Sequence, residues 1–117
     1  MSIKYAYLGP AGTFTEAALL KITNQGDQLI AYANVTAALN AVRNGECEKA
    51  LVPIENSIEG VVARTLDELA IGEPLVITAE TTLPVSFALM TLPNTDFSCV
   101  FFRSYCDFTK FQYLEIF

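Results

Sequence analysis

The sequence contains no histidine and no tryptophan, and it has only seven Lys and Arg residues against thirteen Asp and Glu residues. The absence of histidine removes the usual general base near neutral pH, the commonest metal ligand and any Ser-His-Asp triad. Catalysis must therefore use hydroxyls, carboxylates, amides or backbone N–H groups. The net charge of −6 comes without any run of basic residues, which excludes the clustered cations that nucleic-acid binding needs. A small molecule or another protein remains as the partner.

Cysteine is also scarce, because Cys47, Cys99 and Cys106 are odd in number, widely spaced and without a Cys-x-x-Cys pair. This pattern predicts reduced thiols, with neither a disulfide framework nor a zinc site. No stretch approaches the roughly 18 apolar residues of a membrane-spanning helix, and the apolar part of residues 1–10 is too short for a signal peptide. The sequence therefore predicts a cytoplasmic protein without a membrane partner. Its 52% of apolar residues suffices for the core of one small domain or one lobe.

Strand-like and helix-like segments alternate through the first part of the chain. Strands are expected over residues 3–8, 29–33 and 49–54, and helices over 13–23, from Asn34 or Thr36 to Gly45, and over 61–71. Three strands alternating with three helices predict βαβ units and an α/β fold with a parallel sheet. In the third helix, Leu66 and Leu69 are expected to face the core. Two further strand-like segments, 75–82 and 85–92, flank Pro84, which predicts a bend between them.

Residues 96–117 differ from the preceding chain in being rich in aromatic side chains. They contain Phe97, Phe101, Phe102, Tyr105, Phe108, Phe111, Tyr113 and Phe117. The apolar residues before them are mainly Ala, Leu and Val, so this shift is the only compositional boundary in the chain.

Two segments place small polar residues where a strand is expected to give way to a helix. They are residues 9–16, Gly-Pro-Ala-Gly-Thr-Phe-Thr-Glu, and residues 52–60, Val-Pro-Ile-Glu-Asn-Ser-Ile-Glu-Gly. In an α/β sheet, such turns lie at the carboxyl ends of parallel strands, where helix N-termini present N–H groups to anions. Together they predict a site for a small carboxylic acid. The expected binding residues are Gly12, Thr13, Phe14, Thr15, Glu55, Asn56, Ser57 and Gly60.

Each turn also has a purely structural interpretation. Thr13 and Glu16 have the Thr-x-x-Glu spacing of a capping box, which would start the helix at Thr13. Beside a helix N-terminus, Glu55 would tend to stay ionised and could orient Asn56 or accept a hydroxyl proton. In the structural interpretation, Glu55 is a surface carboxylate that only stabilises the turn. Asn56 and Ser57 could likewise form an ordinary turn or cap.

Other anion-binding motifs are missing from the sequence. Residues 9–13 lack the Gly-x-x-x-x-Gly-Lys of a P-loop and the Gly-x-Gly-x-x-Gly of a dinucleotide fold. Arg43, Lys49 and Arg64 could each neutralise an anion, but lone cations at helix ends usually lie in solvent. They are therefore not included in the predicted site.

Three segments resemble the prephenate dehydratase family. Residues 5–18, Tyr-Ala-Tyr-Leu-Gly-Pro-Ala-Gly-Thr-Phe-Thr-Glu-Ala-Ala, look like its opening motif, and residues 52–60 are similar to its second and most diagnostic motif. Residues 80–85, Glu-Thr-Thr-Leu-Pro-Val, resemble a third and weaker segment. The resemblance therefore covers about residues 3–93, and the order and spacing of the motifs make chance a poor explanation.

The resemblance implies a lyase of phenylalanine biosynthesis in the shikimate pathway, which converts prephenate to phenylpyruvate with loss of water and carbon dioxide. Formation of the aromatic ring drives this reaction, so an acid and anion-holding donors suffice, and no metal or cofactor is expected. The implied fold has two α/β lobes related to type II periplasmic binding proteins, with the active site between them. Residues 1–78 would form the first lobe, and residues 79–117 would begin the second with an atypical aromatic-rich tail.

The family's Thr-Arg-Phe motif, which is credited with the acid role through its Thr, does not occur in this sequence. The regulatory domain that often follows is missing too, and residues 96–117 do not resemble the family's continuation into the second lobe. We therefore expect a truncated or divergent catalytic domain with little or no activity by itself. Glu55 is its only candidate catalytic residue.

Two other interpretations remain open. The same bilobal architecture serves carriers and sensors of small acids, so the chain could be a non-catalytic binding module. Alternatively, the aromatic tail could provide a hydrophobic surface that forms a homo-oligomer or replaces the second lobe. Within the enzyme interpretation, arogenate is an alternative substrate to prephenate.

Overall fold

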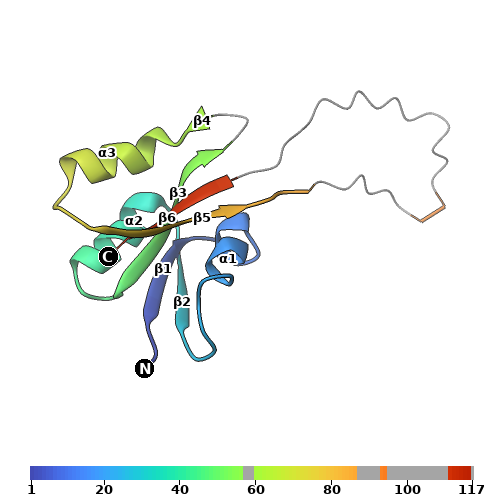
Figure 1. The fold of residues 1–117 in the computed structure, drawn as a ribbon, viewed down its shortest axis with the longest axis horizontal. Coiled ribbons are helices and arrows are strands. Elements are labelled where there is room, and N and C mark those ends of the chain that lie inside the picture. The colour runs from blue at the N-terminus through green and yellow to red at the C-terminus, as the bar shows by residue number, and fades with distance from the viewer. Residues whose placement is uncertain (57–59, 87–92, 95–110, 117) are drawn as a thin grey trace.

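The structure is an α/β/α arrangement in which three helices cover the two faces of one central sheet (Figure 1). The computed structural model describes residues 1–56, 60–86, 93–94 and 111–116. The strands are β1 (Lys4–Leu8), β2 (Gln28–Tyr32), β3 (Lys49–Asn56), β4 (Gly60–Val61), β5 (Ile77–Leu83) and β6 (Phe111–Ile116), and the helices are α1 (Phe14–Leu19), α2 (Val35–Arg43) and α3 (Ala63–Ile71). The predicted α/β fold class is thus confirmed.

The sheet has the strand order β2-β1-β3-β6-β5, with β4 paired to the far end of β3. Strand β1 is parallel to both β2 and β3, as the alternating pattern predicts. Strand β6 is antiparallel to both of its neighbours, and it inserts between β3 and β5. The sequence pattern did not predict this insertion. In Figure 1, the red β6 arrow lies between the green β3 and the orange β5.

Alternating residues of the strands face two separate hydrophobic layers. Tyr5 and Tyr7 of β1 pack on the α1 side with Leu19, Leu51 and Tyr113, whereas Ala6 faces the α2 side. The α2 side also contains Leu39, Ala50, Val52, Leu114 and Ile116, and Leu69 of α3 packs against it. Because successive strand residues point to opposite faces, β1, β3 and β6 each contribute to both layers.

Strand β6 is a core element. Tyr113 and Ile116 are almost completely buried, on opposite faces of the sheet. Phe97, Phe101, Phe102, Tyr105, Phe108 and Phe117 lie outside the described residues. The predicted boundary between two lobes at residue 78 stays a prediction, although β5, which crosses it, belongs to the same sheet as β1.

Helix α2 begins and ends where its sequence signals predict. The Asn34 side chain accepts a hydrogen bond from the Ala37 N–H at 2.8 Å, which caps the first turn. At the other end, Gly45 has a φ of 75°, a left-handed conformation that suits glycine. Thr36 is therefore an ordinary first-turn residue, and its hydroxyl donates to Glu68 Oε1 of α3 at 2.7 Å.

Helices α1 and α3 differ from the prediction. Helix α1 ends at Leu19, and the following residues form tighter turns. In α3, Leu66 is exposed and Thr65 is fully buried, so the expected inward position of Leu66 is wrong, whereas that of Leu69 is confirmed. The Thr65 hydroxyl donates to the Pro53 carbonyl at 2.7 Å, which fixes this face of α3 against β3.

Glu68 makes the stability of the fold depend on pH. Hydrogen bonds from Thr36 and Arg43 hold the pKa of Glu68 below its ordinary value of 4.5, against a smaller opposing effect of desolvation. Such a group stabilises the folded state above its unfolded pKa, and this contribution is lost as the pH falls through the folded pKa. We expect the melting temperature to fall as the pH is lowered below about 4.5, and to fall less in Glu68→Gln.

Thermal melts of both proteins between pH 7 and pH 3 measure this difference. Backbone hydrogen bonds also lower the pKa of Asp27, so acid sensitivity remains in the Glu68→Gln variant. Identical pH profiles for the two proteins would contradict the role of Glu68.

Among the described residues, no helix is both long enough and apolar enough to cross a membrane.

Candidate functional site

The first polar segment connects β1 to α1, as the sequence predicts. Gly12 has a φ of 84°, with no atom within 4 Å of the position that a Cβ would take. Thr13 is the N-cap residue of α1, but its side chain makes no capping hydrogen bond. Its hydroxyl instead donates weakly to the Leu8 carbonyl at 3.5 Å. The prediction of a capping box is therefore wrong for the Thr13 side chain.

Glu16 forms a different pair of hydrogen bonds from those of a capping box. Its Oε2 accepts from the Gly12 N–H, one residue before the position that a capping box uses. Its Oε1 accepts from the Tyr7 hydroxyl at 3.3 Å. Burial and the nearby Glu16 carboxylate raise the pKa of Tyr7, so this hydroxyl stays protonated and can donate. Glu16 thus joins the turn to the buried face of β1.

Thr15 faces the core. Its side chain is buried, and its hydroxyl forms a hydrogen bond with Tyr113 of β6. Burial raises the pKa of Tyr113, while this hydrogen bond has a smaller opposing effect. Phe14, the preceding residue, is 41% exposed. Of the four binding residues predicted in the first segment, Gly12, Thr13 and Phe14 lie toward solvent, whereas Thr15 attaches α1 to the sheet.

The second polar segment does not form the predicted turn from a strand directly into a helix. Strand β3 continues through Glu55 and Asn56, and Asn56 pairs with Gly60 in the short antiparallel β4. Helix α3 begins only at Ala63, where Val62 is an N-cap residue without a side-chain hydrogen bond. Glu55 therefore does not precede α3 directly in the chain, but its backbone pairs with Val61, which is next to the N-cap residue Val62. Ser57 lies outside the described residues.

A proline explains the irregular pairing of this part of β3. Pro53 has no N–H to donate, and the register between β3 and β6 shifts between Pro53 and Glu55. The Pro53 carbonyl accepts its hydrogen bond from Thr65 of α3. Beyond the shift, Asn56 pairs with Phe111, the first residue of β6.

The two segments lie at the same end of the sheet but at different heights along the strands. Strand β1 ends at Leu8, and its neighbour Tyr7 pairs with Leu51 of β3. Glu55 is three residues beyond the level of Leu8, which corresponds to about 10 Å along a strand. The exposed Glu55 and the half-buried Asn56 therefore extend past the end of β1.

A cavity of about 300 Å³ adjoins the start of the first segment. It is lined by Gly9, Pro10, Ala31, Tyr32 and Ala33, where β1 and β2 end. A side chain at Gly9 would place its Cβ only 2.9 Å from that of Ala31, so glycine permits the close approach of these two chains.

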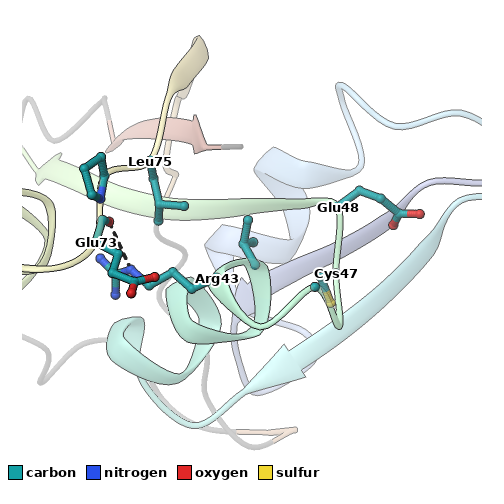
Figure 2. A pocket seen from close by; sticks show the side chains of 8 residues that line it. Arg43, Cys47, Glu48, Glu73 and Leu75 are labelled. Atoms are coloured by element: carbon teal, nitrogen blue, oxygen red, sulfur yellow. Dashed lines mark hydrogen bonds between the residues drawn. The ribbon is translucent and has the colours of Figure 1, made fainter.

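A larger cavity of about 400 Å³ lies near the amino end of β3, opposite the polar segments (Figure 2). Its lining consists of Val42, Arg43, Gly45, Cys47, Glu48, Glu73, Pro74 and Leu75. In Figure 2, Arg43 extends toward Glu73, whose carbonyl accepts from Arg43 Nε at 3.2 Å. None of the predicted binding residues lines either cavity. The role of these residues in binding therefore stays a prediction.

The sequence analysis missed the roles of Tyr7 and Tyr113, and it assigned Glu16 to a capping box with the wrong partner. Tyr7 looked like an ordinary strand residue and Tyr113 like part of the aromatic-rich tail, but their hydroxyls bond to Glu16 and Thr15 of α1. The spacing of Gly12 and Glu16 was an available signal, because a glycine four residues before a carboxylate allows the bond between them.

The described residues define an α/β lobe with a polar turn and an extended polar strand at the same end of its sheet. A family model described as prephenate dehydratase matches residues 5–101. The chain belongs to the prephenate dehydratase family.

Known relatives support this assignment. A prephenate dehydratase of Amycolatopsis methanolica is 52% identical over 88 residues, which is 75% of this chain and 29% of the relative. One from Mycobacterium leprae (strain TN) is 54% identical over 100 residues, covering 78% of this chain and 31% of the relative. The chain thus spans about a third of the length of these curated relatives.

Two solved structures share the fold. Prephenate dehydratase from Arthrobacter aurescens, in complex with L-Phe, matches with a TM-score of 0.65 and 48% identity over 71% of this chain and 28% of that chain. Prephenate dehydratase from Streptococcus mutans matches with a TM-score of 0.74 and 26% identity over 98% of this chain and 49% of that chain. The second match reaches into β6.

Proposed function

We propose that this chain carries the prephenate-binding lobe of a prephenate dehydratase of phenylalanine biosynthesis. The observation that carries the proposal is the family match over residues 5–101, which includes both polar segments. The proposal makes prephenate the substrate, places the protein in the cytoplasm and keeps residues 1–78 as the first lobe. Residues 79–117 would then begin the second lobe, although β5 and β6 complete the sheet of the first.

The chemistry demands little of the protein. The bond from the ring to its carboxylate breaks, and carbon dioxide leaves. The electron pair of this bond enters the ring as the C–OH bond breaks. Hydroxide takes a proton and leaves as water. The protein must hold the substrate carboxylates and supply that proton. We propose Thr13, Phe14 and Asn56 as the main binding residues, with Gly12, Ser57 and Gly60 shaping the two segments. Glu55 is the candidate catalytic residue.

Low activity of this chain is the second part of the proposal. The Thr-Arg-Phe motif does not occur in the sequence; residues 109–111, Thr-Lys-Phe, differ from it only at the middle position. Lysine lacks the rigid, bidentate hydrogen-bonding fork of arginine, so residues 109–111 would not serve in place of the motif wherever that fork is used. We propose that the chain binds prephenate and turns it over slowly or not at all.

A paired binding and turnover measurement tests the proposal. We expect calorimetry to detect prephenate binding, and the absorbance of phenylpyruvate to rise far more slowly than with a full-length relative. Thr13→Val should weaken binding by about 1 kcal/mol through loss of one hydrogen bond. Thr23→Val, a half-buried threonine after α1 and outside the three family motifs, is the matched control and should bind normally.

The outcomes separate the alternatives. Turnover at the rate of a full-length relative would refute the low-activity part, and loss of that turnover in Thr109→Val would assign the acid role to Thr109. Arogenate titrated in parallel establishes the substrate preference. Absence of binding to either acid would refute the binding lobe itself.

A further inference from the structure

Among the described residues, Glu16 is the one side chain of α1 with hydrogen bonds both to β1 and to the turn before the helix. Its two carboxylate oxygens accept from different donors, the Gly12 N–H and the Tyr7 hydroxyl. Tyr7 is 2% exposed, so its hydroxyl would be buried without a partner if Glu16 moved away.

Apart from Glu16, few side chains contact the turn. Pro10, Ala11 and Gly12 are exposed, and no side chain packs around the Cβ position of Gly12. The turn is attached to the sheet at its start, where the Gly9 N–H donates to the Tyr32 carbonyl at 2.8 Å. At its end, the bond from Thr13 to Leu8 is long. The Gly12 conformation therefore depends mainly on Glu16.

Glu16 also changes which groups of the turn can bind a ligand. A substrate carboxylate at the Gly12 N–H would meet the Glu16 carboxylate at close range, and like charges repel in such a geometry. Because the Thr13 hydroxyl does not cap α1, it is better placed to contact a ligand than the Gly12 N–H.

We propose that Glu16 is a positioning residue, which holds the turn over residues 9–13 against Tyr7 and thereby sets the place of Thr13 at the site. The structure alone supports the role of Glu16 in positioning the turn, whereas the effect of Glu16 on prephenate binding rests on the proposed function. Glu16 itself does not contact the substrate, and Gly12 serves as its anchor.

Amide hydrogen exchange at Gly12, measured by NMR, tests the positioning without any ligand. In the wild type we expect a protected amide, and in Glu16→Ala at least a tenfold loss of protection. Tyr7→Phe should give a smaller loss, because it removes only one of the two bonds. Glu16→Gln can still accept from Gly12 and should keep most of the protection. Glu73→Ala, an exposed carboxylate between α3 and β5, is the matched control and should change nothing.

Calorimetry on the same variants tests the effect on binding. At a temperature where thermal melts show every variant to be folded, we expect the Kd for prephenate to rise at least fivefold in Glu16→Ala and to be largely restored in Glu16→Gln. Unchanged Gly12 protection in Glu16→Ala would overturn the proposal. If Glu16→Ala fails to fold, the comparison of Tyr7→Phe with the wild type decides instead. Wild-type protein that protects Gly12 but does not bind prephenate would refute only the proposed function.

Discussion

A chain that lacks residues 96–117 should not fold. The deletion removes β6 from the middle of the sheet and takes Tyr113, Leu114 and Ile116 out of the two hydrophobic layers. At about 1.5–3 kcal/mol for each large buried side chain, the loss approaches the whole stability of a small domain, about 5–15 kcal/mol. Circular dichroism should show no cooperative melting transition, and size-exclusion chromatography should show aggregation or an expanded chain.

Two substitutions at Tyr113 give graded controls for this deletion. Tyr113→Ala should cost about 3–5 kcal/mol, because a fully buried aromatic ring is lost. Tyr113→Phe keeps the ring and removes the hydroxyl with its hydrogen bond to Thr15, at about 1 kcal/mol. A deletion variant that remains a soluble, cooperatively folded monomer would show that β6 is dispensable. It would also contradict the interpretation of the tail as an association surface.

Replacing Arg43 by methionine should destabilise the protein by about 3 kcal/mol. The Arg43 side chain is 9% exposed and forms an ion pair with Glu68 at 3.2 Å. It also donates to the Glu68 and Glu73 carbonyls and to Asn40 Oδ1. Methionine fills much of the same volume but leaves Glu68 as a poorly compensated carboxylate between α2 and α3. Urea unfolding at pH 7 measures the loss.

Arg64→Met is the matched control, because Arg64 is an exposed cation of α3. Its removal should change the free energy of unfolding by no more than about 0.5 kcal/mol. Equal losses for the two variants would show that Arg43 contributes only as a surface charge. Glu68→Gln, combined with Arg43→Met, should recover part of the loss, since no unpaired charge remains.

The parallel half of the sheet was predictable from the sequence because its signals are local. A continuous apolar run marks β3, and Asn34 and Gly45 mark the ends of α2. The insertion of β6 was not predictable in this way. Its partners in β3 and β5 are distant in sequence, and pairing between distant strands leaves no periodic signal.

Only part of the candidate site was predictable, because some of its features have local sequence signals and others depend on tertiary pairing. The first segment follows β1 as expected, since Gly-Pro-Ala-Gly ends a strand on local grounds. The position of Glu55 depends instead on pairing with both β4 and β6, which extends β3 beyond its apolar run. The roles of Thr15 and Glu16 depend on tyrosines of β1 and β6, which reach α1 only through tertiary packing.

The central place of β6 has a consequence for synthesis on the ribosome. Strands β3 and β5 are made long before β6, and each exposes an unpaired inner edge until residues 111–116 have left the exit tunnel. Exposed strand edges pair readily with other chains, and pairing between distant segments slows folding. The nascent chain therefore passes through an interval in which it is open to aggregation, and chaperones that shield apolar strands would act on it during that interval.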